Sequence, residues 1–126
     1  MPVVHPADLT WSELPGRMAA DPLAAGPMAG IDTGTTVRVV RVNPGPRLPH
    51  LHPHSAEILY ILTGTGTTWE GDEAHPVGPG DVVVVPVGVP HATVATSPEG
   101  LTVVCFFAHP DLGANTEELP GPERST

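Results

Sequence analysis

Short β-prone runs recur along most of this chain and limit what it can fold into. Between residues 37 and 107, segments rich in Val, Ile, Thr and Leu alternate with turn clusters of Gly, Pro, Asn and Ser. This alternation is typical of an all-β sandwich or barrel. Eight such runs without a long helical pattern predict a double-stranded β-helix, a jelly-roll barrel. The expected strands are 37–43, 47–52, 57–62, 65–70, 73–77, 81–85, 91–96 and 101–107.

The regions on either side of these runs differ in composition. Residues 1–36 are rich in Ala, Pro and Gly without a period, which predicts an irregular N-terminal arm anchored by Trp11, Leu14 and Met28. Residues 37–108 form the expected barrel domain. Residues 109–126 contain three prolines and predict a C-terminal tail that is disordered at its end. Between two of the runs, Gly71-Asp72 predicts a tight hairpin.

Charge and composition exclude several classes of partner. The net charge is −9, with fourteen acids against five arginines and no lysine, which is unsuited to a nucleic-acid backbone. No apolar run approaches the length of a membrane span, and no secretory signal pattern is visible. The single cysteine, Cys105, is expected in the core and suits a reducing compartment. We therefore expect a cytoplasmic protein that binds neither nucleic acid nor membrane.

Histidines and one glutamate gather in two short segments. The first holds His50, His52, His54 and Glu57, and the second ends at His91. Strand residues two apart point to the same face, so His50 and His52 are expected to point the same way. Three imidazoles and one carboxylate form a ligand set for a divalent transition metal.

The spacing of the two segments resembles the two motifs of the cupin superfamily. In the first, His50-x-His52 is followed by four residues, Glu57, six residues and Gly64; Gly45 stands one residue closer to His50 than usual. In the second, Gly80 is followed by five residues, Pro86-x-Gly88, two residues and His91. The final Asn of that motif is replaced by Ala95, which removes a polar contact from the expected pocket wall.

The resemblance implies that His50, His52, Glu57 and His91 hold one divalent metal ion per chain, with iron or manganese favoured and zinc, nickel or copper possible. Pairing His52 with His54 instead breaks the usual spacing. His54 is therefore expected beside a ligand or at the pocket mouth, or else simply exposed. Glu57 and His54 are the candidate catalytic residues.

Strand parity predicts the pocket lining. Leu59 and Ile61 share parity with Glu57, and Thr93 and Ala95 share parity with His91. Three arginines, at positions 38, 41 and 47, either hold an anionic substrate or make the solvated and ion-paired contacts more usual for arginine.

Three functional classes follow from the resemblance, because this fold supports many chemistries. We favour a metal-dependent dioxygenase acting on a chelating aromatic or diketone-like small molecule. The alternatives are a non-redox cyclase, isomerase or lyase, as in polyketide pathways, and a binding module without turnover. A homodimer is also expected, because Ile58, Tyr60 and Leu62 form an apolar outer face opposite the ligands.

Overall fold

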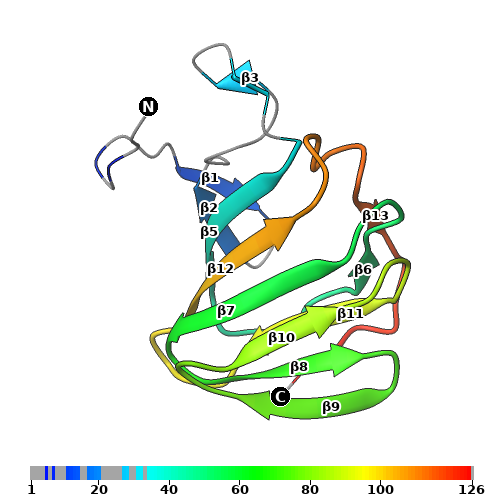
Figure 1. The fold of residues 1–126 in the computed structure, drawn as a ribbon. Coiled ribbons are helices and arrows are strands. Elements are labelled where there is room, and N and C mark those ends of the chain that lie inside the picture. The colour runs from blue at the N-terminus through cyan, green and yellow to red at the C-terminus, as the bar shows by residue number, and fades with distance from the viewer. Residues whose placement is uncertain are drawn as a thin grey trace.

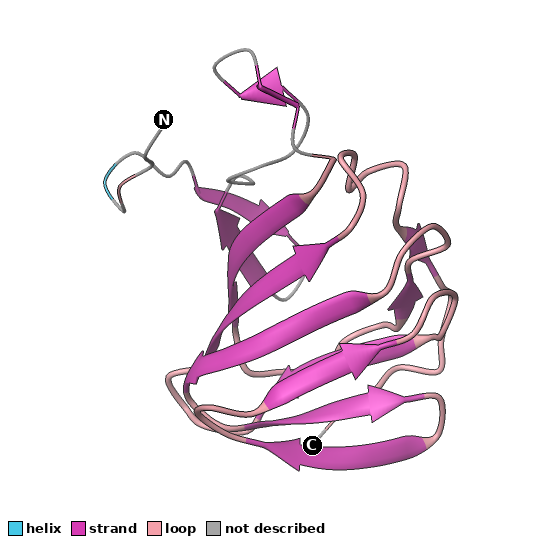
Figure 2. Ribbon diagram, in the orientation of Figure 1, coloured by secondary structure: helices cyan, strands magenta, loops and turns pink. Residues whose placement is uncertain are grey.

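Two antiparallel sheets face each other in the computed structural model (Figure 1). The structure describes residues 5, 7, 11–14, 17–20, 27–28, 31–32 and 34–125, with side chains described at residues 5, 7 and 34–125. One sheet has the order β1-β2-β5-β12-β7-β10 and the other β13-β6-β11-β8-β9, while β3 and β4 pair separately. Strand and loop make up nearly all of the described chain, as Figure 2 shows. The jelly-roll prediction is confirmed.

The strand bounds follow the β-prone runs closely. Five expected strands shift by only one residue at their ends, and the runs at 73–77 and 101–107 have the expected bounds. The barrel strands are β5 Thr36–Val42, β6 His50–Leu51, β7 Glu57–Thr63, β8 Gly66–Glu70, β9 Glu73–Val77, β10 Val82–Val85, β11 His91–Ala95 and β12 Leu101–Phe107.

One strand is much shorter than expected. The predicted strand at 47–52 is reduced to the two residues of β6. Pro46 and Pro49 lack the N–H group that a continuous ladder needs. Arg47 still forms an isolated antiparallel bridge with Arg124, so the chain stays close to the sheet before β6 begins.

Alternation along the strands places the core. In β7, Glu57, Leu59 and Ile61 are buried, while the intervening side chains are exposed. The predicted parity is therefore confirmed for this strand. Val40 and Val103 join Leu59 and Ile61 in the apolar interior between the sheets. Each fully buried side chain of this kind contributes about 1.5–3 kcal/mol.

The hairpin predicted at Gly71-Asp72 is present. β8 pairs with β9 so that Glu70 lies opposite Glu73, which leaves a two-residue turn. Gly71 has φ of 57°, a left-handed conformation that costs little without a Cβ.

The N-terminal arm is not irregular throughout. The strands β1 (Trp11–Leu14) and β2 (Arg17–Ala20) form a hairpin, and β2 pairs with β5 at the edge of the larger sheet. A further short pair joins β3 (Pro27–Met28) to β4 (Ile31–Asp32). The anchoring predicted for the side chains of Trp11, Leu14 and Met28 lies outside what the structure describes. Short strands therefore lie within the arm, which was expected to be irregular.

The C-terminal segment packs on the barrel instead of trailing from it. β13 (Glu117–Glu118) pairs with β6, and Arg124 exchanges two backbone hydrogen bonds with Arg47. Trp69 Nε1 donates to the Ser125 carbonyl at 2.8 Å. Because these contacts come from residues far apart in sequence, the composition of the segment did not reveal them. No helix in the part of the chain that the structure describes has the length and apolar character of a membrane span.

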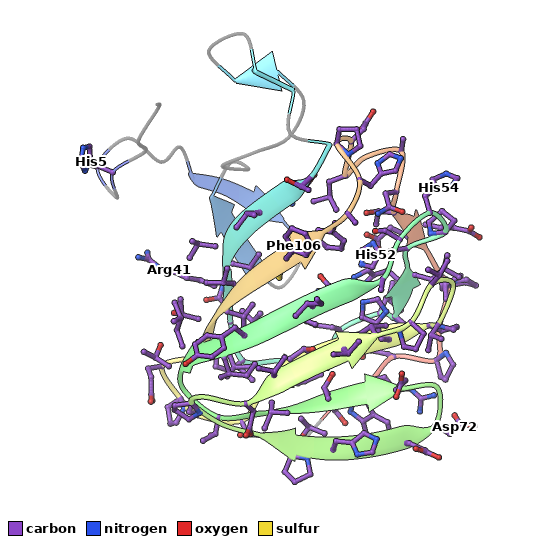
Figure 3. The ribbon with its side chains drawn as sticks, in the orientation of Figure 1. His5, Arg41, His52, His54, Asp72 and Phe106 are labelled. Atoms are coloured by element: carbon purple, nitrogen blue, oxygen red, sulfur yellow. The ribbon has the colours of Figure 1, made fainter. Side chains whose placement is uncertain are left out.

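The outer face of the larger sheet is apolar. Ile58, Tyr60 and Leu62 of β7 are 39–45% exposed, and Val82 and Val84 of the neighbouring β10 are 58% and 60% exposed. In register, Val84 lies opposite Ile58 and Val82 opposite Tyr60, which makes the patch continuous across strands. On the other side of β7, Phe106 of β12 lies opposite Ile58 and is labelled in Figure 3.

We propose that a second copy of the chain covers this face. Two copies that each carry a net charge of −9 repel one another. An uncharged, apolar face is therefore the most favourable surface for their contact. Val84→Glu is expected to give a monomer, because a charge buried in an apolar contact is costly without a partner. Val87→Glu is the matched control, since Val87 is 55% exposed but lies outside the sheet. Light scattering coupled to size exclusion measures the mass; a wild-type monomer at micromolar concentration contradicts the proposal.

Candidate metal centre

The sheet topology brings the four predicted ligands together. His91 begins β11 and lies directly opposite His50 of β6 in the smaller sheet. Glu57 begins β7 in the larger sheet, opposite Val85 of β10 and Phe107 of β12. The loop from β10 to β11 crosses from the larger sheet to the smaller one. The second motif, Gly80 to His91, therefore lies beside the first motif in both sheets.

A glycine in that loop connects the two motifs. Gly88 N–H donates to the His52 carbonyl at 2.9 Å. Its φ is 74°, a left-handed conformation that disfavours any residue with a Cβ. The glycine therefore allows the crossing loop to hold His52, which lies just beyond the end of β6.

These residues form a buried cluster, here called the His/Glu cluster. His50, His52, Glu57 and His91 are 6%, 4%, 5% and 2% exposed. Their potential ligand atoms all lie within 4.8 Å of one another. Glu57 Oε1 lies 2.9 Å from His91 Nε2 and 3.6 Å from His52 Nε2. Figure 3 shows His52 at the end of the barrel near β6 and β13.

The hydrogen bonds of His52 define which nitrogen carries its proton. Nδ1 lies 2.7 Å from the Asn115 carbonyl, which only accepts, so Nδ1 is the donor. Thr116 Oγ1 lies 3.4 Å from the same nitrogen and gives its own proton to the Leu112 carbonyl. Nε2 of the neutral ring therefore carries a lone pair directed at the cluster. This Nε2 is a buried atom with no hydrogen-bond partner among the described residues.

His91 is held in the same way. Its Nδ1 donates to the Val89 carbonyl at 2.9 Å, which leaves the lone pair of the neutral ring on Nε2. That lone pair lies 2.9 Å from the carboxylate oxygen of Glu57. Two electron-rich atoms at this distance repel unless a proton or a cation lies between them.

Glu57 is ionised in this setting. Burial by itself raises the pKa of the Glu57 carboxyl group. Hydrogen bonds and positive charge from the His52 and His91 rings, which need a proton on the facing nitrogens, outweigh it and hold the pKa well below its usual range. A buried carboxylate thus faces two imidazole nitrogens whose other ring nitrogens are committed to backbone carbonyls. A metal cation satisfies all three atoms at once, and carbonyl-bound Nδ1–H groups are the usual support of ligating histidines.

The residues present therefore fit one divalent metal ion. His50, His52 and His91 supply imidazole nitrogens and Glu57 a carboxylate oxygen, a donor set that suits several first-row metals. An ion that accepts six ligands would keep two positions for other molecules. Ligation by these four residues stays a prediction.

The cavity beside the cluster only partly has the predicted lining. Leu59 and Thr93 line it, as expected from parity. Ile61 and Ala95 do not: they are 0% and 2% exposed and belong to the apolar core beneath. Parity gives the face of a strand but not the depth at which a side chain lies. Other residues line the cavity that strand parity did not predict: Val40, Val42, Val103, Cys105, Phe107, Leu112 and Thr116.

Two of the three candidate arginines also line this cavity. Arg38 and Arg47 reach it, whereas Arg41 is exposed on the outside of β5. In Figure 3, Arg41 and His52 lie at opposite ends of the barrel. The parity of β5 separates Arg38 from Arg41, because residues 38, 40 and 42 share one face.

His54 lies outside the cavity lining. Its side chain is exposed and stacks on His109, with 5.4 Å between ring centroids. Its backbone N–H donates to Asn115 Oδ1 at 2.8 Å. The structure thus gives no support to a catalytic role for His54, since nothing places its ring beside the cluster.

Asn115 is the supporting residue that the sequence did not reveal. It is 0% exposed, and its carbonyl orients His52 as described. Its side chain accepts from His54 N and donates from Nδ2 to Ser55 Oγ at 2.8 Å. One asparagine therefore holds the loop that carries His52. It lies 63 residues from His52 in sequence, inside the expected tail, so no local pattern marked it.

Comparison with known proteins places the chain in a family. The family model described as a cupin domain matches residues 38–107, which is more than half of the chain. The chain therefore belongs to the cupin family, as its two motifs predicted. No curated protein matches it.

Several solved structures share the fold. Pac13 from Streptomyces, described as a nucleoside dehydratase, has a TM-score of 0.77 at 17% identity, with 94% of this chain and 91% of that chain covered. KdgF from Halomonas sp. gives 0.68 at 22% identity, covering 86% and 94%. An oxalate decarboxylase variant from B. subtilis gives 0.74 at 25% identity, covering 90% of this chain and 31% of that one. The first two likenesses show the fold alone.

Removal of a ligand tests the metal assignment. His91→Ala is expected to lose most of the metal, because it removes one ligand and leaves Glu57 unmatched. His54→Ala is the matched control and is expected to keep about one ion per chain, since its ring is exposed. Elemental analysis of the two purified variants decides between them. Full occupancy in His91→Ala contradicts the assignment.

Asn115→Ala tests the support of the His52 loop. The variant keeps the carbonyl that binds His52 but leaves the His54 N–H without its acceptor. A cost of about 1–3 kcal/mol in unfolding free energy is expected, with metal affinity lowered by about 10–100-fold. Asn43→Ala, at an exposed position, is the control. Denaturant unfolding and metal titration measure both effects; equal values for the two variants refute the role of Asn115.

Proposed function

We propose that this cupin is a metal-dependent oxygenase acting on a small molecule that binds the metal through two neighbouring oxygens. The proposal rests on one observation about the cavity. Besides the His/Glu cluster, the titratable side chains among its described lining are Arg38, Arg47 and Cys105. An arginine stays protonated, and a thiol buried in apolar surroundings is inert. The described lining therefore supplies no general base outside the ligand set.

This absence favours metal-centred chemistry over acid–base chemistry. A cyclase, isomerase or dehydratase normally relies on a positioned side chain to move a proton. Here the His/Glu cluster would hold the ion and Glu57 would also neutralise part of its charge. With a redox-active ion held there, the cluster would support electron transfer between a chelated substrate and dioxygen. A dioxygenase places both oxygen atoms in its products, so no external reductant is needed.

The other residues of the cavity limit the size of the substrate and surround it with apolar walls. Val40, Val103 and Phe107 form apolar walls that keep water from the bound molecule. Phe107 also packs against the His52 ring, with centroids 4.6 Å apart, and so fixes its orientation. The cavity volume is about 40 Å³, room for only a few water-sized groups. A compact diketone or enediol suits this space better than a multi-ring aromatic.

Reconstitution with different metals tests the proposal. Apo-protein is loaded separately with iron, manganese and zinc and offered small diketones and enediols with and without dioxygen. Oxygen uptake is expected only with iron or manganese, because zinc has no redox chemistry. His91→Ala protein carried through the same loading is the blank.

Turnover without oxygen would overturn the assignment. Equal product formation under argon with zinc would place the protein among the non-redox lyases and isomerases. That is also the class of Pac13, which is described as a dehydratase. Tight ligand binding without product under any condition would instead support a binding module.

A further inference from the structure

Positive charge is concentrated around the cavity of an acidic chain. The chain has five arginines and a net charge of −9, yet Arg38 and Arg47 both line this cavity. Glu57 is the one acidic side chain in the described lining. By contrast, Arg41 is exposed, and Arg124 lies on the surface in an ion pair with Asp72. With a divalent ion in the cluster, the cavity carries a net positive charge.

The register of the larger sheet places Arg38 level with Leu59, on the side of the cavity. Arg38 lies opposite Cys105 of β12, and Cys105 lies opposite Leu59 of β7. Leu59 is two residues beyond Glu57 and points to the same side. Two strand spacings, about 9–10 Å, thus separate the backbones of Arg38 and Leu59. The Arg38 side chain lines the same cavity as the cluster.

Arg47 approaches from the opposite sheet and is held firmly. It is 9% exposed, and its Nη1 donates to the Thr93 carbonyl at 2.7 Å. Thr93 lies two residues beyond His91 on β11. The guanidinium is therefore fixed in the wall beside the cluster, where it adds positive charge in a low-dielectric setting.

We infer that the substrate is a small carboxylate that would bind the metal through one carboxylate oxygen and a neighbouring hydroxyl or keto oxygen, while Arg38 receives the carboxylate group. The inference rests on the proposed function in one respect, that the substrate binds at the His/Glu cluster. A guanidinium presents a planar pair of N–H donors that matches a carboxylate. The apolar walls and small volume suit a compact 2-hydroxy- or 2-oxocarboxylate. This names the chemical class of the substrate, which the cluster alone leaves open.

Binding to zinc-loaded protein tests the inference without turnover. The probes are lactate and its uncharged counterpart lactamide, which share the hydroxyl group and nearly the same shape. NMR titration gives the two dissociation constants for wild type, Arg38→Gln and Arg41→Gln. Arg41→Gln is the matched control, because it makes the same charge change on the outer side of the same strand.

Arg38→Gln is expected to weaken lactate binding by about 10–100-fold, the loss of a charge-assisted hydrogen bond, and to leave lactamide unchanged. Arg41→Gln is expected to bind both probes as wild type does. Zinc content and thermal unfolding verify that each variant is loaded and folded. Arg38→Lys is a second variant that keeps the charge and is expected to recover part of the lactate affinity.

Each other outcome has a defined meaning. Lactate that does not bind zinc-loaded protein, or that binds Arg38→Gln and Arg41→Gln equally, overturns the inference while the metal assignment stands. Inorganic phosphate is the third probe, and phosphate that binds more tightly than lactate overturns the choice of a carboxylate. Failure of wild-type protein to take up zinc would remove the proposed function itself, which separates the two failures.

Discussion

The contact between Glu57 Oε1 and the imidazoles of His52 and His91 is the constraint on which the site depends. Two backbone carbonyls, those of Asn115 and Val89, take the Nδ1 protons of the two rings. Both Nε2 atoms of the neutral rings therefore present lone pairs toward a buried carboxylate. That arrangement is unfavourable by itself and becomes favourable around a cation. The prediction of a metal ion thus rests on hydrogen bonds that do not involve the metal.

The strand arrangement of the barrel brings Glu57 and the histidines into contact. His50 and His91 are paired across two strands of the smaller sheet, and Glu57 begins a strand of the larger one. The crossing loop is tied to the His52 carbonyl through Gly88. The larger sheet itself separates the cluster and the apolar interior on its inner side from the exposed Ile58, Tyr60 and Leu62 on its outer side. A single scaffold thereby carries an enclosed polar site and an apolar outer surface on the two sides of one strand, β7.

Much of this was predictable because it depends on local pattern. The alternation along β7 gave its buried and exposed sides, and the spacing of the two motifs gave the four cluster residues. What the sequence did not reveal depends on tertiary contacts between distant segments. Asn115 contacts His52 from a segment 63 residues away in sequence, which only the pairing of β13 with β6 brings near. Ile61 and Ala95 were wrongly assigned to the lining, since the period of a strand contains no information on depth.

A crystal structure of the zinc-loaded protein with anomalous data at the zinc edge tests the central claim most directly. The account predicts a single anomalous peak inside the His/Glu cluster, about 2.0–2.2 Å from the Nε2 atoms of His52 and His91 and from a Glu57 oxygen. It also predicts that both Nδ1 atoms keep their contacts with the Asn115 and Val89 carbonyls. A loaded crystal with zinc bound elsewhere, or with either imidazole turned away from Glu57, would contradict it.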